Sequence, residues 1–267
     1  GYRFAQRFSD PLIGAVSGRQ ILLNREESIT ASGEASYRDF FTRIRTAESI
    51  LHSTPIFHGE CSAYRRKAIS EHQLVENSNA DDSQMAVSSV RSGFRAIYDP
   101  EITFFEMAPP DGNASQIQKV RRAQGLVRHF WRNRDMIVDS RYGKFRKIMA
   151  LEFILHIIIP IVVVLGFFAG FSHMGLLFYE FGLSVPSNQS LLFVDTFMLA
   201  ADIIVILLLF SGFLGLPIPA SRLSFTFFNY MITLFKAQLL ILRGRSLHQW
   251  QQVSAVRDML AEYDKNS

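Results

Sequence analysis

The stretch ADDSQMAVSSVRSGFRAIYDPEITFFE, residues 80–106, establishes the architecture of the first half of the chain. Two aspartates stand before an amphipathic run that is typical of a helix over about 82–92, because carboxylates accept the free N–H groups of a first helical turn. Extended segments rich in aromatic and β-branched residues follow near 94–98 and 102–106. A helix that leads directly into strands indicates an α/β layered domain.

The residues upstream continue this alternation. GAVSGRQILL, residues 14–23, predicts another extended segment, since apolar and β-branched residues lie between glycines and a polar turn. A helix is expected over 34–52, where large apolar residues recur at helical spacing. We expect these residues to pack a core rather than contact a ligand: Tyr37, Phe40, Phe41, Ile44 and Leu51.

Downstream, the composition changes to that of a membrane protein. IMALEFILHIIIPIVVVLGFFAGF, residues 148–171, has only Glu152 as a charged residue and is long enough to cross a hydrocarbon core of about 30 Å. A second apolar run, 191–214, is similarly long but contains Asp195 and Asp202. Both are predicted to span a bilayer within a transmembrane region, 148–242.

Basic residues beside the apolar runs predict the orientation. Lys and Arg are concentrated before the first span, so we expect 136–147 to form a basic interfacial helix on the cytoplasmic side. The loop 172–190 has neither residue and is expected to face outward. The tail, 243–267, is basic again and is cytoplasmic only if an even number of segments crosses. The third apolar stretch, 219–242, is therefore expected to be re-entrant or interfacial. These features predict a multi-pass protein of the cell membrane whose first half is cytoplasmic.

Asp202 lies near the middle of the second span, where a carboxylate costs roughly 2.5–3.5 kcal/mol on insertion scales and needs a partner. Lys236 is the candidate by residue type, and the pair would lock two segments together. The alternative is a polar track of Asp202, Asn229 and Gln238 along which a hydrophilic product passes. A transporter is a third functional class, although the two predicted spans are few for a translocation pathway.

Charged residues at two helices are the candidates for chemistry. Asp81 and Asp82 cap a helix, but a carboxylate at such a corner can also act as a general base. Gln118, Arg121 and Arg122 lie within about one turn of a helix, and guanidinium groups suit a diphosphate. A basic helix ahead of a span also contacts anionic lipid, so both roles stay open.

Composition excludes several other classes of function. Cys61 is the only cysteine, which excludes a disulfide framework and a multi-cysteine zinc site. The seven histidines include no H-x-x-x-H pair, so no metal site is assigned. The net charge of +4 comes largely from residues beside the membrane segments, which argues against nucleic acid as a partner and favours membrane lipid.

The order of the motifs resembles the second half of a membrane-integrated family 2 glycosyltransferase, the group of cellulose, hyaluronan and poly-N-acetylglucosamine synthases. The motifs are GAVSG, then GECSAYRR, then ADD before a helix ending in SGFRAIYDPE, then QKVRR with spans behind it. The resemblance implies that 1–135 is the C-terminal part of a GT-A-type nucleotide-sugar transferase domain. It also implies inverting transfer from a nucleotide-sugar donor to a saccharide or lipid-linked acceptor at the cytoplasmic face.

The resemblance also implies roles for individual residues. Asp82 corresponds to the last residue of the family's T-E-D motif, the general base, and Asp81 stands at its Glu. Gln118 and Arg121 match the first and fourth positions of Q-x-x-R-W, where the arginine contacts the diphosphate, and Arg122 stands at the Trp. Two further residues lie where a loop borders donor sugar and acceptor: Gly59 and Glu60.

Three departures from the family pattern affect these expectations. Ala80 replaces the Thr of T-E-D, and Arg122 replaces an aromatic platform for the acceptor, which argues against processive synthesis. The family's D-x-D motif, which holds Mg²⁺ or Mn²⁺ in the intact parent, should precede the GYRFAQRF that begins at Gly1. The chain is therefore expected to be a fragment with little turnover alone. The alternative is a non-catalytic, membrane-anchored binding or scaffold protein.

Overall fold

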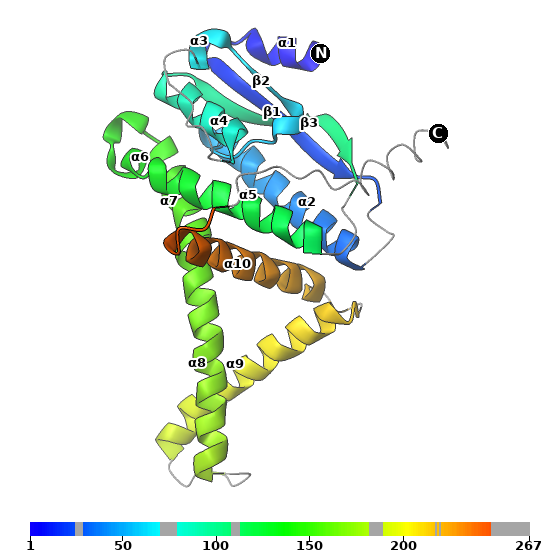
Figure 1. Cartoon of the computed structure of the whole chain (residues 1–267), viewed down its shortest axis with the longest axis vertical. Helices are drawn as coiled ribbons and strands as arrows, with labels where there is room; N and C mark the ends of the chain where they lie inside the picture. The colour runs from blue at the N-terminus through cyan, green and yellow to red at the C-terminus, as the bar shows by residue number, and fades with distance from the viewer. Residues whose placement is uncertain are drawn as a thin grey trace.

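The computed structural model describes residues 1–24, 29–69, 79–107, 113–181, 189–216, 218 and 220–246. The chain forms a mixed α/β structure that is mostly helical, with a small sheet at one end and a long helix extending away from the other (Figure 1). The strands are β1 (Ile13–Leu22), β2 (Ser62–Tyr64) and β3 (Arg95–Glu106). The first-half helices are α1 (Tyr2–Phe8), α2 (Ile29–Leu51), the 3₁₀ turn η1 (Gly59–Cys61), α3 (Arg66–Ile69), α4 (Asp81–Arg91) and α5 (Asn113–Arg132).

The sheet has the order β2-β1-β3, with β1 antiparallel to β2 and parallel to β3. The extended segments expected at 94–98 and 102–106 are one strand with an irregularity, because the register steps from Gly18 opposite Asp99 to Arg19 opposite Thr103. Pro100 lies in the skipped stretch, where its missing N–H breaks no ladder bond. The strand β1 is central and almost wholly buried, which explains its run of small and apolar residues.

The main core joins helices from both halves of the chain. Apolar residues of α4 and α5 pack with residues of α10 (Ser221–Leu242), among which Met231, Leu234 and Ala237 are fully buried. Burying one large apolar side chain contributes about 1.5–3 kcal/mol, so this contact makes α10 part of the α/β unit. Figure 1 shows α10 lying beneath α5 and α2 and running across the start of the long helix.

The helix α2 packs differently from the expected core helix. Phe41 is buried, but Phe40 and Leu51 are 43% and 46% exposed. The expectation that both pack a core was wrong, because α2 is covered along only one stripe, and that stripe carries Tyr37 and Phe41. Part of this stripe faces a cavity rather than a core.

The basic segment 136–147 does not form the single helix that was expected. It contains α6 (Asp135–Val138), the 3₁₀ turn η2 (Ser140–Tyr142) and the start of α7 (Phe145–Phe153). The Asp139 carboxylate accepts a hydrogen bond from the Arg141 backbone N–H at 2.9 Å, which stabilises a turn rather than a helix. Gly143 then has a φ of +49°, a conformation that stops a right-handed helix.

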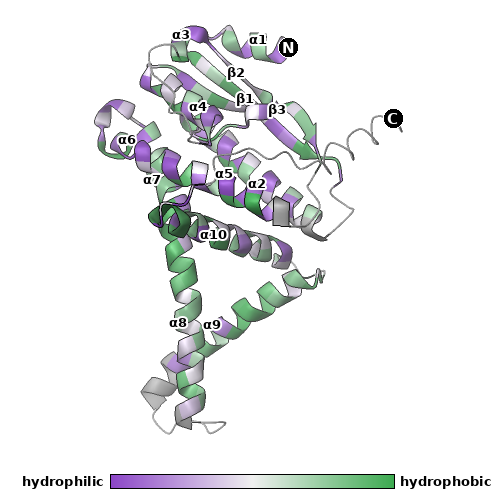
Figure 2. Cartoon of the chain, viewed as in Figure 1, coloured by the Kyte–Doolittle hydropathy of each residue, from purple (hydrophilic) through white to green (hydrophobic). Residues whose placement is uncertain are grey.

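Three helices are long and apolar enough to span a membrane: Phe145–Tyr179, Asp195–Phe213 and Ser221–Leu242. The first combines α7, the π-helical turn η3 (Ile154–Ile158) and α8 (Ile159–Phe181); the second lies within α9 (Gln189–Phe213) and the third is α10. Figure 2 shows α8 and α9 as largely hydrophobic, whereas α10 mixes hydrophobic and hydrophilic residues. The predicted spans therefore coincide with α7–α8 and α9.

Gln238 connects α10 to the π-helical turn. Its side-chain amide donates to the backbone carbonyls of His156 and Ile157, both at 3.2 Å. Pro160 has no N–H to offer the His156 carbonyl four residues earlier, so the amide supplies a missing hydrogen bond. Gln238 thus fastens two helices together instead of forming part of a polar track.

Asp202 has a different partner from the one expected. His173 of α8 lies between two carboxylates of α9, with Nε2 3.4 Å from Asp195 Oδ1 and Nδ1 3.9 Å from Asp202 Oδ2. The predicted Asp202–Lys236 pair does not form, because Asp202 faces α8, whereas Lys236 faces a cavity beside α10. The acidic residues of α9 therefore hold α8 and α9 together.

Candidate active site

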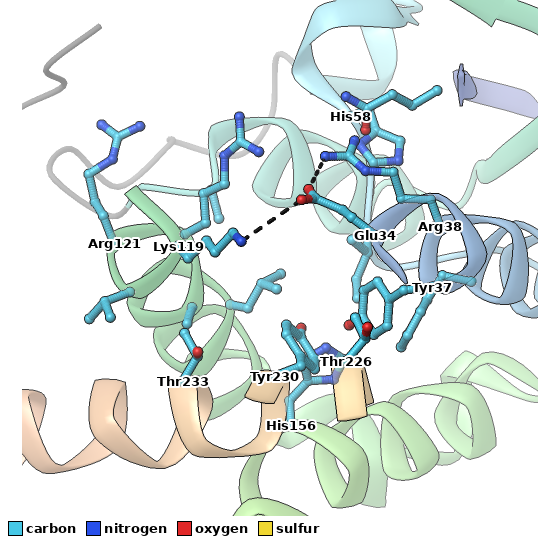
Figure 3. A pocket seen from close by; sticks show the side chains of 18 of the residues that line it. Glu34, Tyr37, Arg38, His58, Lys119, Arg121, His156, Thr226, Tyr230 and Thr233 are labelled. Atoms are coloured by element: carbon cyan, nitrogen blue, oxygen red, sulfur yellow. Dashed lines mark hydrogen bonds and ion pairs between the residues drawn. The ribbon is translucent and has the colours of Figure 1, made fainter. Parts of the chain in front are cut away.

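A cavity of about 1440 Å³ lies where α2, α5, α10, the start of α4 and η1 meet. Figure 3 shows its side chains converging from α5, from α2 and from α10 on an open space. Four of the residues implied by the family motifs line it on the α4 and η1 side: Gly59, Glu60, Asp81 and Asp82. Arg121 and Arg122 of α5 line the same cavity.

The cavity lining is strongly charged, with an excess of cations. Seven Lys and Arg residues line it against four carboxylates, which is an excess of three positive charges. The cations are Arg38, Arg45, Lys119, Arg121, Arg122, Arg222 and Lys236, and the carboxylates are Glu34, Glu60, Asp81 and Asp82. Such a cavity attracts a multiply charged anion, for which guanidinium groups supply paired donors.

Asp82 is the most enclosed carboxylate at the α4 corner. Ala80 is the N-cap, so both aspartates lie in the first helical turn rather than at the cap position. Asp82 Oδ1 accepts a hydrogen bond from the Ser83 backbone N–H at 2.7 Å. A Cβ on Gly59 would lie only 3.5 Å from Asp82 Oδ2, so the other oxygen borders the η1 backbone. Burial raises the pKa of Asp82 above its ordinary value, and nearby Glu60 adds to the rise. A carboxylate with a raised pKa accepts a proton more readily.

The α5 side of the cavity carries the two arginines of the QKVRR motif. Arg122 Nη2 lies 3.7 Å from Glu60 Oε1, which links α5 to η1. Burial and the neighbouring Arg122 lower the pKa of Arg121, while Asp81 acts in the opposite direction. The Arg121 guanidinium stays charged at physiological pH, since its ordinary pKa lies far above that range.

The structure does not bring Gln118 to the cavity. Gln118 is half-buried on α5, and Gln116, two residues earlier, lines the cavity in its place. Positions two apart lie on nearly opposite sides of a helix, so only one of the two glutamines can face this space.

A glycine determines how closely α5, which carries the arginines, approaches the start of α4, which carries the aspartates. A Cβ on Gly125 of α5 would lie 1.7 Å from the backbone carbonyl oxygen of Asn79, far inside van der Waals contact. Asn79 stands two residues before Asp81 and has a φ of +52°. Gly125 therefore allows α5 to touch the backbone just before α4, which brings the arginines to the aspartates.

The helix α2 supplies charged residues that the sequence analysis missed. Glu34 Oε1 accepts from Arg38 Nη2 at 2.6 Å, and Glu34 Oε2 lies 3.9 Å from Lys119 Nζ on α5, so this carboxylate bridges the cavity wall (Figure 3). Arg45 Nη1 contacts His58 Nε2. Burial and the nearby arginines lower the pKa of His58 well below its ordinary value, so the ring is neutral and can accept from Arg45. Arg38 and Arg45 are seven residues apart, a spacing that could have placed them on one face.

The floor of the cavity is polar and aromatic. Tyr37 of α2 and Tyr230 of α10 have ring centroids 5.0 Å apart and both line the cavity. Below them, His156 Nδ1 lies 3.0 Å from Glu152 Oε2 within the helix that leads into α8. Burial and Glu152 raise the pKa of Glu48 to about 9, so Glu48 is protonated at neutral pH and can share a proton with Glu152.

The residues described do not fit a divalent metal. No group of three or more His, Cys, Asp or Glu side chains within the described part of the chain could hold a metal ion. The two aspartates of α4 and Glu60 border the same cavity but do not form such a group. The chemistry derived below therefore uses only side chains of this chain.

The amino-acid sequence matches one known protein family. The sequence profile of Glycosyl transferase family group 2 matches residues 2–235. The chain belongs to this glycosyltransferase family. The match runs from α1 through α9 and most of α10, so the apolar helices are part of the glycosyltransferase match. No curated protein matches the chain.

Proposed function

We propose that this glycosyltransferase transfers a sugar, with inversion, from a nucleotide-sugar donor to a saccharide or lipid-linked hydroxyl. The observation that carries the proposal is that Asp82 and Arg121 line one cavity. A general base and a cation for the leaving diphosphate are the two groups that a single displacement needs. The family match alone does not place these two residues at the same cavity.

In the proposed reaction, Asp82 takes the proton of the acceptor hydroxyl, and the oxygen of that hydroxyl attacks the anomeric carbon of the donor sugar. The bond between that carbon and the diphosphate oxygen breaks, and the nucleoside diphosphate leaves with the electron pair. Arg121 and Arg122 stabilise the charge that develops on the diphosphate. Gly59 leaves room beside Asp82 Oδ2 for the acceptor, and Glu60 holds Arg122.

The test is transfer of radiolabelled sugar by membranes that contain the protein expressed from its complete gene. Asp82→Asn removes the base and keeps the side-chain volume, so transfer should fall by about 10²–10⁴-fold, while donor affinity stays within about twofold of the wild type. Asp81→Asn is the matched control, because Asp81 is exposed and should cost far less activity.

Two outcomes would contradict the proposal. Transfer by Asp82→Asn near the wild-type rate would remove Asp82 as the base. Donor binding by the wild type without any transfer would favour a non-catalytic, membrane-anchored binding protein instead.

We also propose how the protein sits in the membrane. The helices α7–α8 and α9 cross, the α/β unit lies on the cytoplasmic side, and α10 lies at the interface. The packing of α10 against α5 and α2 and its mixed polarity support this arrangement. Protease added outside right-side-out vesicles should leave the segment after Leu242 intact, and its cleavage would contradict the proposal.

A further inference from the structure

One face of α10 carries a polar stripe into the cavity. The cavity-lining residues of this helix recur every three or four positions, and five of them are polar: Arg222, Thr226, Asn229, Thr233 and Lys236. This spacing places them along one side of a helix whose other residues are mostly apolar. Because Met231, Leu234 and Ala237 already anchor α10 in the core, the helix does not need these polar groups for packing.

The cations at the two ends of the stripe have no carboxylate partner among the described residues. Arg222 donates to Ser32 Oγ at 3.3 Å and to the Gly215 carbonyl at 3.1 Å, both of which are neutral. Lys236 is exposed to the cavity and lies in no ion pair within the described part of the chain. The stripe therefore offers hydroxyl and amide groups between two uncompensated positive charges.

The far end of the cavity is apolar and adjoins a candidate span. Phe213 at the end of α9 lines it together with Phe225 of α10, with ring centroids 5.9 Å apart. Phe213 is 63% exposed, and Phe210, one turn back along α9, is also exposed. This end of the cavity therefore lies beside a helix, α9, that is apolar and long enough to cross a bilayer.

One cavity therefore contains three regions: the charged residues around Asp82, the polar stripe of α10, and the apolar end at Phe213 and Phe225. Resting on the function proposed above, we propose that the acceptor is a saccharide carried on a phosphate-bearing membrane lipid. The acceptor hydroxyl lies at Asp82, the sugar contacts the polar stripe of α10, the phosphate pairs with Arg222 beside the apolar end, and the lipid tail leaves past Phe213. The proton of the hydroxyl passes to Asp82, the new bond forms at the anomeric carbon of the donor, and the nucleoside diphosphate departs.

The first experiment identifies the product of transfer. Membranes containing the protein expressed from its complete gene receive a radiolabelled nucleotide-sugar, and the product is partitioned between organic and aqueous phases. The label should enter the organic phase and be released by mild acid, as expected of a phosphate-linked lipid. Transfer of label to a product that stays aqueous would overturn the lipid acceptor and leave the proposed function standing.

The second experiment measures binding and does not depend on turnover. Purified protein in nanodiscs of neutral lipid is titrated with geranylgeranyl phosphate, with geranylgeraniol and with inorganic phosphate. The phosphate-bearing lipid should bind at least about tenfold more tightly than either partial probe, because it alone uses both ends of the site. Equal affinity for geranylgeranyl phosphate and geranylgeraniol would contradict the proposed pairing of the phosphate with a cation of the polar stripe.

Variants then locate the phosphate. Arg222→Gln should weaken geranylgeranyl phosphate binding by about tenfold, the scale of one lost charge-assisted contact, and Arg222→Lys should restore most of it. Lys147→Gln is the control, since Lys147 is an exposed basic residue before α8 and is not a cavity residue. An equal loss in both variants would mean general attraction to basic flanks and would overturn the site. Lipid binding that depends on Arg222 without any transfer would support the lipid site and reject the proposed catalysis.

Discussion

Asp82 combines a buried carboxylate with access to a cavity. Its pKa is raised chiefly by burial, and the Ser83 backbone N–H opposes that rise. A raised pKa means that the folded state holds this proton more tightly than the unfolded state does. The stabilising contribution is therefore complete below the pKa of the unfolded carboxyl, and it is lost as pH rises through the higher pKa of the folded protein. At neutral pH the ionised Asp82 costs stability, which is expected of a carboxylate kept for function rather than for folding.

The consequence is a prediction about stability and pH. Asp82→Asn should raise the melting temperature at pH 7 by roughly 2–4 °C for each kcal/mol recovered, and the difference should shrink as pH falls toward 4. Thermal unfolding of purified wild type and Asp82→Asn between pH 4 and 8 measures this. A variant that is less stable than the wild type at pH 7 would show that the carboxylate serves the fold through Ser83 instead.

Some residues of the cavity could be predicted from sequence and others could not. Asp82 and Arg121 stand in recognisable motifs, and the structure places both at one cavity. Tyr37 was expected to pack a core and Arg45 was not singled out, because the aromatic spacing of α2 does not reveal that part of its stripe faces a cavity. Gln118 was named from the motif, whereas Gln116 lines the cavity, because a motif identifies residues but not which side of a helix faces the ligand.

At the scale of elements, the close approach of α5 to the start of α4 determines the geometry of the site. Gly125 permits this approach, since any side chain there would collide with the Asn79 carbonyl. The arginines and aspartates are more than thirty residues apart in sequence, and this single contact sets how near they come. Small shifts in such positioning can reduce a rate about 100-fold.

We therefore expect Gly125→Ala to reduce transfer at least about tenfold, because α5 must move away from α4 by a substantial part of a van der Waals contact. Both donor affinity and the maximal rate should fall, since Arg121 moves relative to Asp82. Gly166→Ala is the control, because nothing lies within 4 Å of a Cβ at Gly166 on α8. Normal transfer by Gly125→Ala would show that the α4–α5 contact does not control the site.

The elements themselves were largely predictable, whereas their junctions were not. The strand near 14–23 and the helix over 82–92 were confirmed with shifts of about one residue at their ends. The interruption of 136–147 by Asp139 and Gly143 was missed, since basic composition alone suggested a continuous helix. The docking of Gln238 on the carbonyls of the π-helical turn depends on contacts between segments about eighty residues apart, which no local pattern reveals.

At the scale of the molecule, α10 unites the two halves of the chain. It shares a buried core with α4 and α5, borders the cavity with its polar stripe, and meets α9 at the apolar end. Sequence composition separated the chain into a soluble half and a membrane half, and it did not predict that one cavity would use both. A helix of mixed polarity can connect the two halves because one face packs in the core and another lines the cavity. Its remaining residues are compatible with lipid.

The central claim is that Asp82 and Arg121 act on one activated sugar. A structure of the protein, expressed from its complete gene, with a non-transferable nucleotide-sugar analogue tests this claim most directly. We expect the diphosphate within hydrogen-bond reach of the Arg121 guanidinium and the anomeric carbon facing the Asp82 carboxylate across a gap that one acceptor hydroxyl can fill. A diphosphate bound away from Arg121, or a donor whose anomeric carbon is screened from Asp82 by protein, would contradict the account.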